Sequence, residues 1–327
     1  MTNQIRPVVI SCGEPSGIGP EVALGAWQQL KSHIPIAWVG DPRHVPGGVD
    51  VHIMTSLEDV KNCPENAFPV LEHRFFSAAI PGDPDPKNAQ GVIDVIARCV
   101  DMVSNGEASA VCTAPIHKKA LMDGAGFAYP GHTEYLQALA GEASGRAVMM
   151  LASDALKVVP ATIHIALEEV PKQLTPKLLR ETVQITHQDL QSRFGIAAPR
   201  IAIAGLNPHA GEGGAMGREE LDWINNLVAD MRDEGFDLLG PLPADTMFHA
   251  AARKNYDAAV AMYHDQALIP IKTLDFDRGV NVTLGLSFIR TSPDHGTAFD
   301  IAGRGIANPQ SMVEAIRMAA RMAGWRG

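Results

Sequence analysis

Three histidines follow apolar stretches of strand length, and imidazole nitrogen is a common ligand of zinc and related divalent ions. His164 comes after "VVPATI", His209 after "IAIAGLNP" and His264 after "AAVAMY". In open α/β sheets ligands bind beyond the carboxyl ends of the strands, so these three side chains could surround one ion. Three protein ligands would leave coordination positions for a substrate. The spacing matches no compact metal motif such as H-E-x-x-H, so separate structural roles for the three histidines remain an alternative.

Polar side chains that could handle an anionic substrate occur near the last of these histidines. Lys272, Asn281 and Arg290 lie in "PIKTLDFDRGVNVTLGLSFIRTS". Lysine and arginine are the usual partners of phosphate and carboxylate, although single residues of this kind are more often surface charges. Asp245 follows a less certain strand in "LLGPLPADT". Asp245 and Lys272 are therefore the candidate catalytic residues.

Two glycine-rich stretches are typical of loops in which the backbone approaches a ligand closely. "CGEPSGIGPE" (12–21) follows an apolar run and precedes a helical pattern, but it is neither G-x-G-x-x-G nor a Walker A loop. A tight turn and a direct contact with phosphate both remain possible for it. "NPHAGEGG" (207–214) surrounds His209, and its glycines favour a ligand beside that histidine.

Two further segments contain candidate binding residues. "GHTEYL" (131–136) has the pattern of a helix start, where His132 and Thr133 could hydrogen-bond a ligand or simply cap the helix. "DHGTAFDIAGRGIANP" (294–309) has the pattern of a long irregular loop before a terminal helix, and long ordered loops are often functional.

Buried strands that alternate with helices must position these residues. Apolar runs predict strands at 6–12, 35–40, 108–115, 147–153, 156–165, 200–208, 257–264 and 280–289. Helical patterns cover residues near 20–31, 91–106, 175–194, 217–235 and 309–325. Strands that are apolar throughout indicate mostly parallel sheets covered on both faces. We therefore expect an α/β protein with two lobes and a soft boundary near 125–145.

Composition excludes several classes of protein. The 327 residues are 46% hydrophobic, which suits a globular protein, and the net charge of −10 argues against a nucleic-acid partner. No apolar run reaches the length of a membrane span, and the N-terminal residues do not resemble a signal peptide. The four scattered cysteines indicate reduced thiols. A cytoplasmic protein with a small-molecule substrate is expected.

Several stretches together resemble the 4-hydroxythreonine-4-phosphate dehydrogenase family, which belongs to the isocitrate and isopropylmalate dehydrogenase-like superfamily. They are "GEPSGIGPE", "TAPIHK", "GHTEYL", "NPHAGEGG", "GPLPADT", "YHDQALIPIK" and "VNVTLGLSFIRTSPDHGTAFDIAGRG". The match runs in order from about residue 7 to the end. "HGTAFDIAGRGIANP" is also similar to the adenosine-binding loop of isopropylmalate dehydrogenases, with Thr297 and Phe299 in place of Ser and Pro.

The resemblance implies a fold and a set of site residues. It implies two α/β/α lobes with an active site in the cleft between them, the first lobe formed by 1–130 plus about 290–327 and the second by about 131–289. It implies a homodimer in which the partner chain contributes His264. The implied metal ligands are His164, His209 and His264, for zinc, magnesium or cobalt. The implied substrate-binding residues are His132, Thr133, Lys272, Asn281 and Arg290. The implied cofactor-binding residues are His295, Gly296, Thr297, Asp300 and Asn308.

The family's reaction belongs to pyridoxal 5′-phosphate biosynthesis. It is the oxidation of 4-phosphooxy-L-threonine at C3 by NAD or NADP, with a divalent metal, and the product decarboxylates to 3-amino-2-oxopropyl phosphate. Three alternatives remain open. They are a sister dehydrogenase acting on threonate or erythronate 4-phosphate, a metal-dependent phosphate-ester hydrolase, and a non-catalytic protein that binds a phosphorylated metabolite.

Overall fold

The computed structural model describes residues 6–141 and 144–326, and the chain divides into two compact units. The first unit contains Met1–Ala147 and Leu286–Gly327, and the second contains Val148–Gly285. The chain thus leaves the first unit and later returns to it. Residues 131–147 belong to the first unit, whereas the sequence placed them in the second lobe. None of the helices in the described part of the chain has the length and apolar character needed to span a bilayer.

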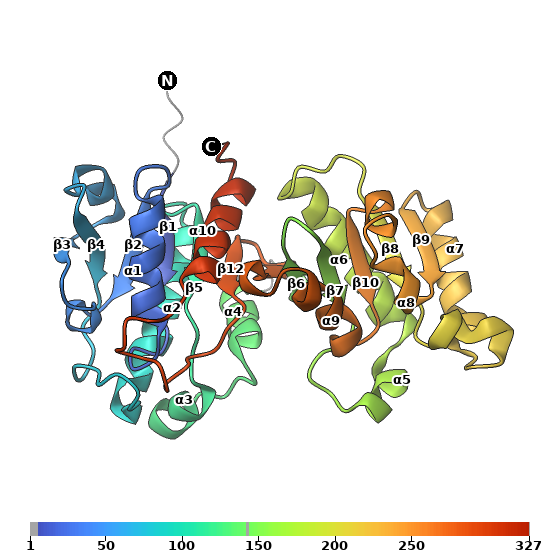
Figure 1. Ribbon diagram of the computed structural model, residues 1–327, viewed down its shortest axis with the longest axis horizontal. Helices are drawn as coiled ribbons and strands as arrows, with labels where there is room; N and C mark the ends of the chain where they lie inside the picture. Colours follow the sequence, from blue (N-terminus) through green and yellow to red (C-terminus); the bar gives the residue numbers. More distant parts are fainter. Residues whose placement is uncertain (1–5, 142–143, 327) are drawn as a thin grey trace. The chain divides into compact units, whose positions relative to one another are not determined.

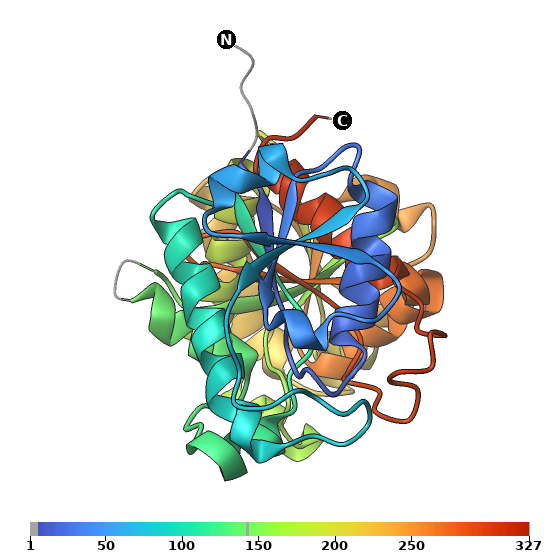
Figure 2. The same cartoon turned by 90° about the vertical axis from the view of Figure 1, so that its left-hand side faces the viewer.

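The first unit contains a fully parallel sheet in the order β3-β4-β2-β1-β5-β12. Its strands are β1 (Val8–Ser11), β2 (Ile36–Gly40), β3 (Asp50–Met54), β4 (Ala67–Glu72), β5 (Ala110–Thr113) and β12 (Arg290–Pro293). Its helices are α1 (Gly19–Leu30), α2 (Ala89–Ser104), α3 (Lys118–Ala125), α4 (His132–Ala140) and α10 (Gln310–Met322). Helices α1 and α10 pack together, while α2 packs with α3 and α4. Figure 2 shows α1 and α2 on opposite sides of the blue strands.

The second unit contains a mixed sheet in the order β11-β6-β7-β10-β8-β9, in which β6 is antiparallel to both neighbours and the other pairs are parallel. Its strands are β6 (Val148–Ala152), β7 (Lys157–Pro160), β8 (Arg200–Ala204), β9 (Asp237–Leu242), β10 (Ala258–Ala261) and β11 (Val280–Leu284). Its helices are α5 (Val170–Gln173), α6 (Pro176–Ser192), α7 (Asn225–Asp233), α8 (Ala244–Met247) and α9 (His264–Leu274). Figure 1 shows α9 in front of the strands and α6 behind them.

The apolar segment after His264 is helix α9. Its Ala267, Leu268 and Ile271 are buried in the core of the second unit, against strands β7 and β10. The strand predicted at 280–289 is interrupted. Gly285 has a left-handed φ of 80°, and its N–H donates to Asp189 of α6 at 2.9 Å, so β11 ends at Leu284.

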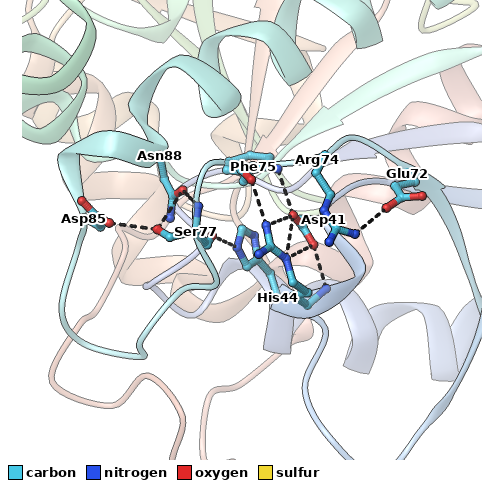
Figure 3. A network of polar contacts seen from close by, with 9 residues as sticks. Asp41, His44, Glu72, Arg74, Phe75, Ser77, Asp85 and Asn88 are labelled. Atoms are coloured by element: carbon cyan, nitrogen blue, oxygen red, sulfur yellow. Dashed lines mark hydrogen bonds and ion pairs between the residues drawn. The ribbon is translucent and has the colours of Figure 1, made fainter.

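A buried carboxylate after β2 fixes the chain that follows β4. Both oxygens of Asp41 accept hydrogen bonds from the Arg43 side chain, and Oδ2 also accepts from the backbone N–H of Phe75 at 2.9 Å. Figure 3 shows the adjoining contacts. His44 Nε2 lies 3.0 Å from the carbonyl oxygen of Ser77, and the backbone N–H of Ser77 donates to the side-chain oxygen of Asn88. In dinucleotide-binding sheets an acidic residue in this region binds the adenosine ribose. The carboxylate of Asp41 instead accepts hydrogen bonds from Arg43 and from Phe75 in the segment after β4.

This ion pair predicts an acid-sensitive contribution to stability. Burial alone would raise the pKa of Asp41, but hydrogen bonds from Arg43 and Phe75 hold it well below the ordinary value of 3.8. A depressed pKa stabilises the fold above the unfolded-state pKa and loses that effect as pH falls toward the folded-state pKa. Asp41→Asn should therefore lower the free energy of unfolding by about 2–3 kcal/mol near neutral pH. The decrease should become progressively smaller below about pH 4.

Thermal unfolding of the two proteins across this pH range tests the expectation. Asp123→Asn is the matched control, because its pair with Lys119 is exposed and contributes little. An Asp41→Asn protein whose deficit stays constant from neutral to acid pH would contradict the assignment.

Candidate active site

The second unit directs three neighbouring parallel strands toward the same end of its sheet. Strand β10 pairs with β7 on one side and with β8 on the other, and Ala261 is in register with Pro160. The three predicted metal ligands lie in the segments that follow these strands. This arrangement explains why histidines distant in the sequence can approach one another.

His164 and His264 come together within one chain. Their ring centroids lie 5.5 Å apart with an interplanar angle of 44°. His264 is the first residue of α9, and its Nδ1 lies 2.7 Å from a carboxylate oxygen of Asp265. With the Nδ1 proton donated to that carboxylate, Nε2 keeps a lone pair for a metal, which is the usual orientation of a metal-binding histidine. The donor chemistry of this pair fits a divalent ion.

His209 lies in a loop with an unusual backbone. Residues 209–213 all have positive φ, and His209 itself has φ 51° and ψ 30°. His164 also has a positive φ, of 52°. Left-handed geometry costs about 1–2 kcal/mol for each residue that has a side chain, and such strain tends to be retained at functional sites. Two of the three predicted ligands are therefore held in backbone conformations that the surrounding structure must impose.

No group of three His, Cys, Asp or Glu side chains arranged to hold a metal occurs among residues 6–141 and 144–326 of a single chain. The structure thus brings two of the predicted ligands together and leaves His209 outside a three-residue cluster. The family resemblance implies that a ligand comes from a second chain, and that this ligand is His264. Because His164 and His264 are in contact within one chain, experiment must test whether His264 binds the metal of its own chain or that of the partner.

The two predicted catalytic residues, Asp245 and Lys272, lie on helices α8 and α9 of the second unit. Asp245 is in α8 and lines a shallow pocket of about 450 Å³ together with Asp265, Gln266 and Ile269. Lys272 is two turns after His264 on α9, about 12 Å further along the axis. Its Nζ lies 5.8 Å from the ring centroid of Phe276. Asn281 is on β11, opposite Leu151 of β6, and is partly exposed.

The first unit contains a buried arginine at the start of β12. Arg290 is 3% exposed, and its Nε and Nη2 donate to the hydroxyl of Thr113 at 3.1 and 2.7 Å. Desolvation lowers the pKa of Arg290 to about 10, so the guanidinium stays charged at neutral pH. A buried guanidinium that keeps its charge favours an anion close to it.

His132 lies close to this cation, at the first turn of α4. Burial, followed by the positive charges of Arg290 and Lys118, lowers the pKa of His132 well below its ordinary value. Its Nε2 is buried and has no hydrogen-bond partner in the described part of the chain. Gly131, the residue before the helix, provides no side-chain cap, and Lys118 lies beside it. Thr133 is in the same first turn. We call Thr113, Lys118, His132, Thr133 and Arg290 the anion-binding group.

The predicted cofactor loop is fixed to the glycine-rich loop after β1. The N–H of Ile18 donates to the carbonyl oxygen of Thr297 at 2.9 Å, and the N–H of Gly303 donates to the carboxylate of Glu21. A Cβ on Gly17 would lie 2.8 Å from the Thr297 carbonyl oxygen, so only glycine permits this approach. Of the two interpretations of "CGEPSGIGPE", the structure thus favours a tight turn against which another loop packs.

Within the cofactor loop the predicted residues have different surroundings. His295 is partly buried, its Nδ1 lies 3.1 Å from the carbonyl oxygen of Gly296, and desolvation lowers its pKa. Asp300 is exposed. The side-chain oxygen of Asn308 accepts from the N–H of Gln310 at the start of α10, which gives Asn308 a structural role.

Sequence reasoning missed three residues that follow or end β5. Thr113 and Lys118 belong to the anion-binding group, and His117 packs edge to face on Phe299 of the cofactor loop, with ring centroids 5.0 Å apart. All three lie in or beside "TAPIHK". The rule that identified His164, polar residues after an apolar strand, applies equally to this stretch.

Within the described residues, these observations define an α/β protein with a histidine pair whose chemistry suits a metal and a buried arginine cluster whose charge suits an anion. The family model "Pyridoxal phosphate biosynthetic protein PdxA" matches residues 28–319, and the chain belongs to this family. A relative from Roseobacter denitrificans, named 4-hydroxythreonine-4-phosphate dehydrogenase, is 69% identical over 323 residues that cover 99% of each chain.

Solved structures share the fold. A 4-hydroxythreonine-4-phosphate dehydrogenase from Klebsiella pneumoniae is 35% identical, with a TM-score of 0.87 and coverage of 97% of this chain and 99% of that one. A terephthalate 1,2-cis-dihydrodiol dehydrogenase from Burkholderia xenovorans is 27% identical, with a TM-score of 0.67, and covers 97% and 98%. The predicted α/β fold with mostly parallel sheets and the predicted family are confirmed.

Proposed function

We propose that this chain oxidises 4-phosphooxy-L-threonine at C3 with NAD or NADP. The product, 2-amino-3-oxo-4-phosphooxybutanoate, is a β-keto acid that loses CO₂ to give 3-amino-2-oxopropyl phosphate, an intermediate on the route to pyridoxal 5′-phosphate. The observation that carries this proposal is the 69% identity over 99% of both chains to a relative with this name. The anion-binding group and the histidine pair supply the chemistry that such a substrate requires.

The phosphate is assigned to the anion-binding group. Arg290 brings a buried positive charge beside the hydroxyl of Thr113, and neutral His132 can donate from Nε2 when its proton is there. Thr133 and the free N–H groups of the first turn of α4 add further donors. Lys272 and Asn281 are assigned to the remaining polar groups of the substrate, where the lysine charge suits the carboxylate.

Oxidation at C3 needs removal of a hydroxyl proton and a hydride. His164, His209 and His264 would hold a divalent ion, with zinc, magnesium and cobalt as candidates, and such an ion lowers the pKa of a bound hydroxyl and stabilises negative charge on oxygen. A nicotinamide cofactor, when bound, would supply the hydride acceptor. Asp245, or a water molecule beside it, accepts the proton. Lys272 lies on the same helix as His264, about 12 Å further along its axis.

A coupled measurement tests this function. The full chain is mixed with 4-phosphooxy-L-threonine, NAD and a divalent metal, and reduced cofactor is followed with and without a chelator. Metal-dependent formation of NADH and 3-amino-2-oxopropyl phosphate supports the proposal. Faster turnover of threonate 4-phosphate, which lacks the amine, would assign the sister reaction. Release of inorganic phosphate without NADH would assign a hydrolase, and no turnover of any of these would assign a binding protein.

The acidic residue of the cofactor loop should decide between NAD and NADP. Exposed Asp300 can accept hydrogen bonds from a ribose hydroxyl, and its charge would repel a 2′-phosphate. Asp300→Ala should weaken NAD binding about tenfold and narrow the preference for NAD over NADP, as measured by isothermal titration. The exposed Asp101 of α2 offers a control, since Asp101→Ala should leave both affinities unchanged. If Asp300→Ala binds NAD and NADP with the same affinities as the wild type does, the result would argue against this role.

We also propose a homodimer whose metal site needs both chains. The surface of the second unit has large exposed apolar side chains along and after α9, with Ile269 63% and Phe276 72% exposed, and a second copy could cover them. In this arrangement His164 and His209 of one chain share a metal with His264 of the partner.

Mixed variants distinguish a shared metal site from one built within a single chain. His164→Ala and His264→Ala dimers should each be nearly inactive. After subunit exchange, half of a random mixture is heterodimer, and one of the two sites in each heterodimer has all three histidines. About a quarter of wild-type activity should therefore return, by two-fold symmetry. A site within one chain, which the 5.5 Å contact permits, predicts no recovery at all.

A further inference from the structure

The loop that carries His209 is anchored by one buried carboxylate. Glu220 is 2% exposed and begins the π-helical turn η6 (Glu220–Ile224), directly before α7. Its Oε1 accepts from the backbone N–H of Asn207 at 2.9 Å, and its Oε2 accepts from the side-chain Nδ2 of Asn207 at 2.9 Å. Glu219 accepts from the same Nδ2 at 2.7 Å. Asn207 precedes the strained run 209–213, so these bonds fix the point from which the run departs.

The glycines of this region shape the space around that carboxylate. A Cβ on Gly211 would lie 2.8 Å from Oε2 of Glu220, and one on Gly205 would lie 3.2 Å from Oε1. A Cβ on Gly217 would overlap the Asn207 amide at 2.2 Å. The sequence suggested that the glycines of "NPHAGEGG" permit close approach to a ligand. Gly211 instead permits close approach of the loop to Glu220.

The hydrogen bonds between Glu220 and Asn207 lie beside a backbone conformation that is unfavourable by itself. Three residues with side chains, His209, Ala210 and Glu212, adopt left-handed conformations in succession. Left to itself, this segment would relax to right-handed or extended geometry. The N–H of Ala210 donates to the carbonyl oxygen of Asn207 at 3.0 Å, which couples the anchored residue directly to the turn that carries His209.

We propose that Glu220, acting through Asn207, is a positioning residue that holds His209 in the conformation in which it binds the divalent metal. This inference rests on the proposed metal site. Outer-shell partners that orient a metal ligand commonly change metal affinity by about 10–100-fold when they are removed. Glu220 does not touch the metal or the substrate in this assignment, and its effect passes through the backbone of the loop.

Cobalt(II) titration of the full chain, followed by visible absorption and by calorimetry, tests the proposal. Glu220→Gln keeps the size of the side chain but replaces one acceptor oxygen with an amide donor that faces the donors of Asn207. It should weaken cobalt binding about 10–100-fold and change the absorption of the bound ion. Asp189→Asn is the matched control, because Asp189 is also a buried acid of the second unit and accepts from a backbone N–H. It should bind cobalt as the wild type does.

A donor–acceptor exchange adds a rescue. In Asn207→Asp combined with Glu220→Gln, the glutamine Oε1 can accept from the backbone N–H, and its amide can donate to the new carboxylate. Because Glu219 would repel that carboxylate, Glu219→Gln is included in the same protein. Recovery of most of the lost affinity is expected, and a purely structural defect at Glu220 would not be corrected in this way. Failure of the triple variant to regain affinity, when it folds, would count against the inference.

The remaining outcomes separate this inference from the proposed function. Wild-type protein that binds no cobalt would reject the metal site and this inference together. Cobalt binding that is lost in His209→Ala but unchanged in Glu220→Gln would reject only the positioning role, as would an equal loss in Asp189→Asn. If Glu220→Gln does not fold, Asn207→Ser is used in its place, since it removes the side-chain donor and keeps the backbone bond. Unchanged cobalt affinity in that variant would also overturn the proposal.

Discussion

Alanine in place of His164, His209 or His264 is expected to remove most of the bound divalent metal and to lower kcat by about 10²–10³-fold. Metal stabilisation of a developing negative charge on oxygen contributes several kcal/mol, and each 1.4 kcal/mol is a factor of ten in rate. The loss should be similar for all three residues, because three ligands that act on one ion are not independent. Metal content by elemental analysis and kcat with saturating substrate check this expectation together.

A histidine outside the proposed site provides the control. His249 belongs to the same unit and is exposed, and His249→Ala should keep both metal and activity. Full metal occupancy in all three single variants would reject the shared ion. Loss of metal in His164→Ala and His264→Ala, with full occupancy in His209→Ala, would limit the site to the pair whose rings lie 5.5 Å apart.

Loss of the Arg290 side chain should have the second largest effect, a fall in kcat/KM of about 30- to 1000-fold. This corresponds to about 2–4 kcal/mol, the usual consequence of removing one member of a buried charge pair. Arg290 is 3% exposed. In a variant that lacks its side chain, water is therefore poorly placed to take over the interaction of the guanidinium with the phosphate. Arg290→Lys should recover only part of the loss, because an ammonium cannot donate to Thr113 and to a phosphate in the planar geometry of a guanidinium.

Substrate concentration series with 4-phosphooxy-L-threonine measure this effect, and most of it should appear in KM. Arg200→Ala is a suitable control. Arg200 forms a two-bond pair with Asp257 at the amino end of β8, away from the end that leads to His209. That change should lower the temperature of unfolding and leave KM unchanged. An Arg290→Ala enzyme with wild-type KM would show that the phosphate binds elsewhere.

Most buried strands were predictable, although the buried strands β4 and β12 were missed. Val8–Ser11 and Ala258–Ala261 are fully buried, and continuous apolar runs of this length have few other solutions. Strand β3 (Asp50–Met54) was missed, because it lies at the edge of its sheet and only Met54 in it is buried. Helix α9 was also hard to foresee, since Pro270 lies inside it and a proline normally argues against a helix interior.

The candidate site was predictable wherever sheet topology alone decides position. His164 and His264 meet because β7 and β10 are parallel neighbours in register, and parallel strands place their exits side by side. The geometry around His209 was not predictable. Glu220, which accepts hydrogen bonds from Asn207 at the start of this loop, lies thirteen residues further along the chain, and no sequence pattern marks it as a partner of the loop. Contacts made by tertiary packing of single polar residues lie beyond what periodicity can reveal.

The first unit draws on both ends of the chain, and this sets the order in which its parts become available during synthesis. Helix α10 packs against α1, and β12 extends the sheet beside β5, although the whole second unit lies between the two members of each pair in the sequence. Contacts between such distant segments form late, because a long intervening chain must first be brought together. The bond between Arg290 and Thr113 spans 177 residues. A nascent chain can therefore complete the second unit before Arg290 can reach Thr113, so the proposed phosphate site would be completed only with the last segments to be made.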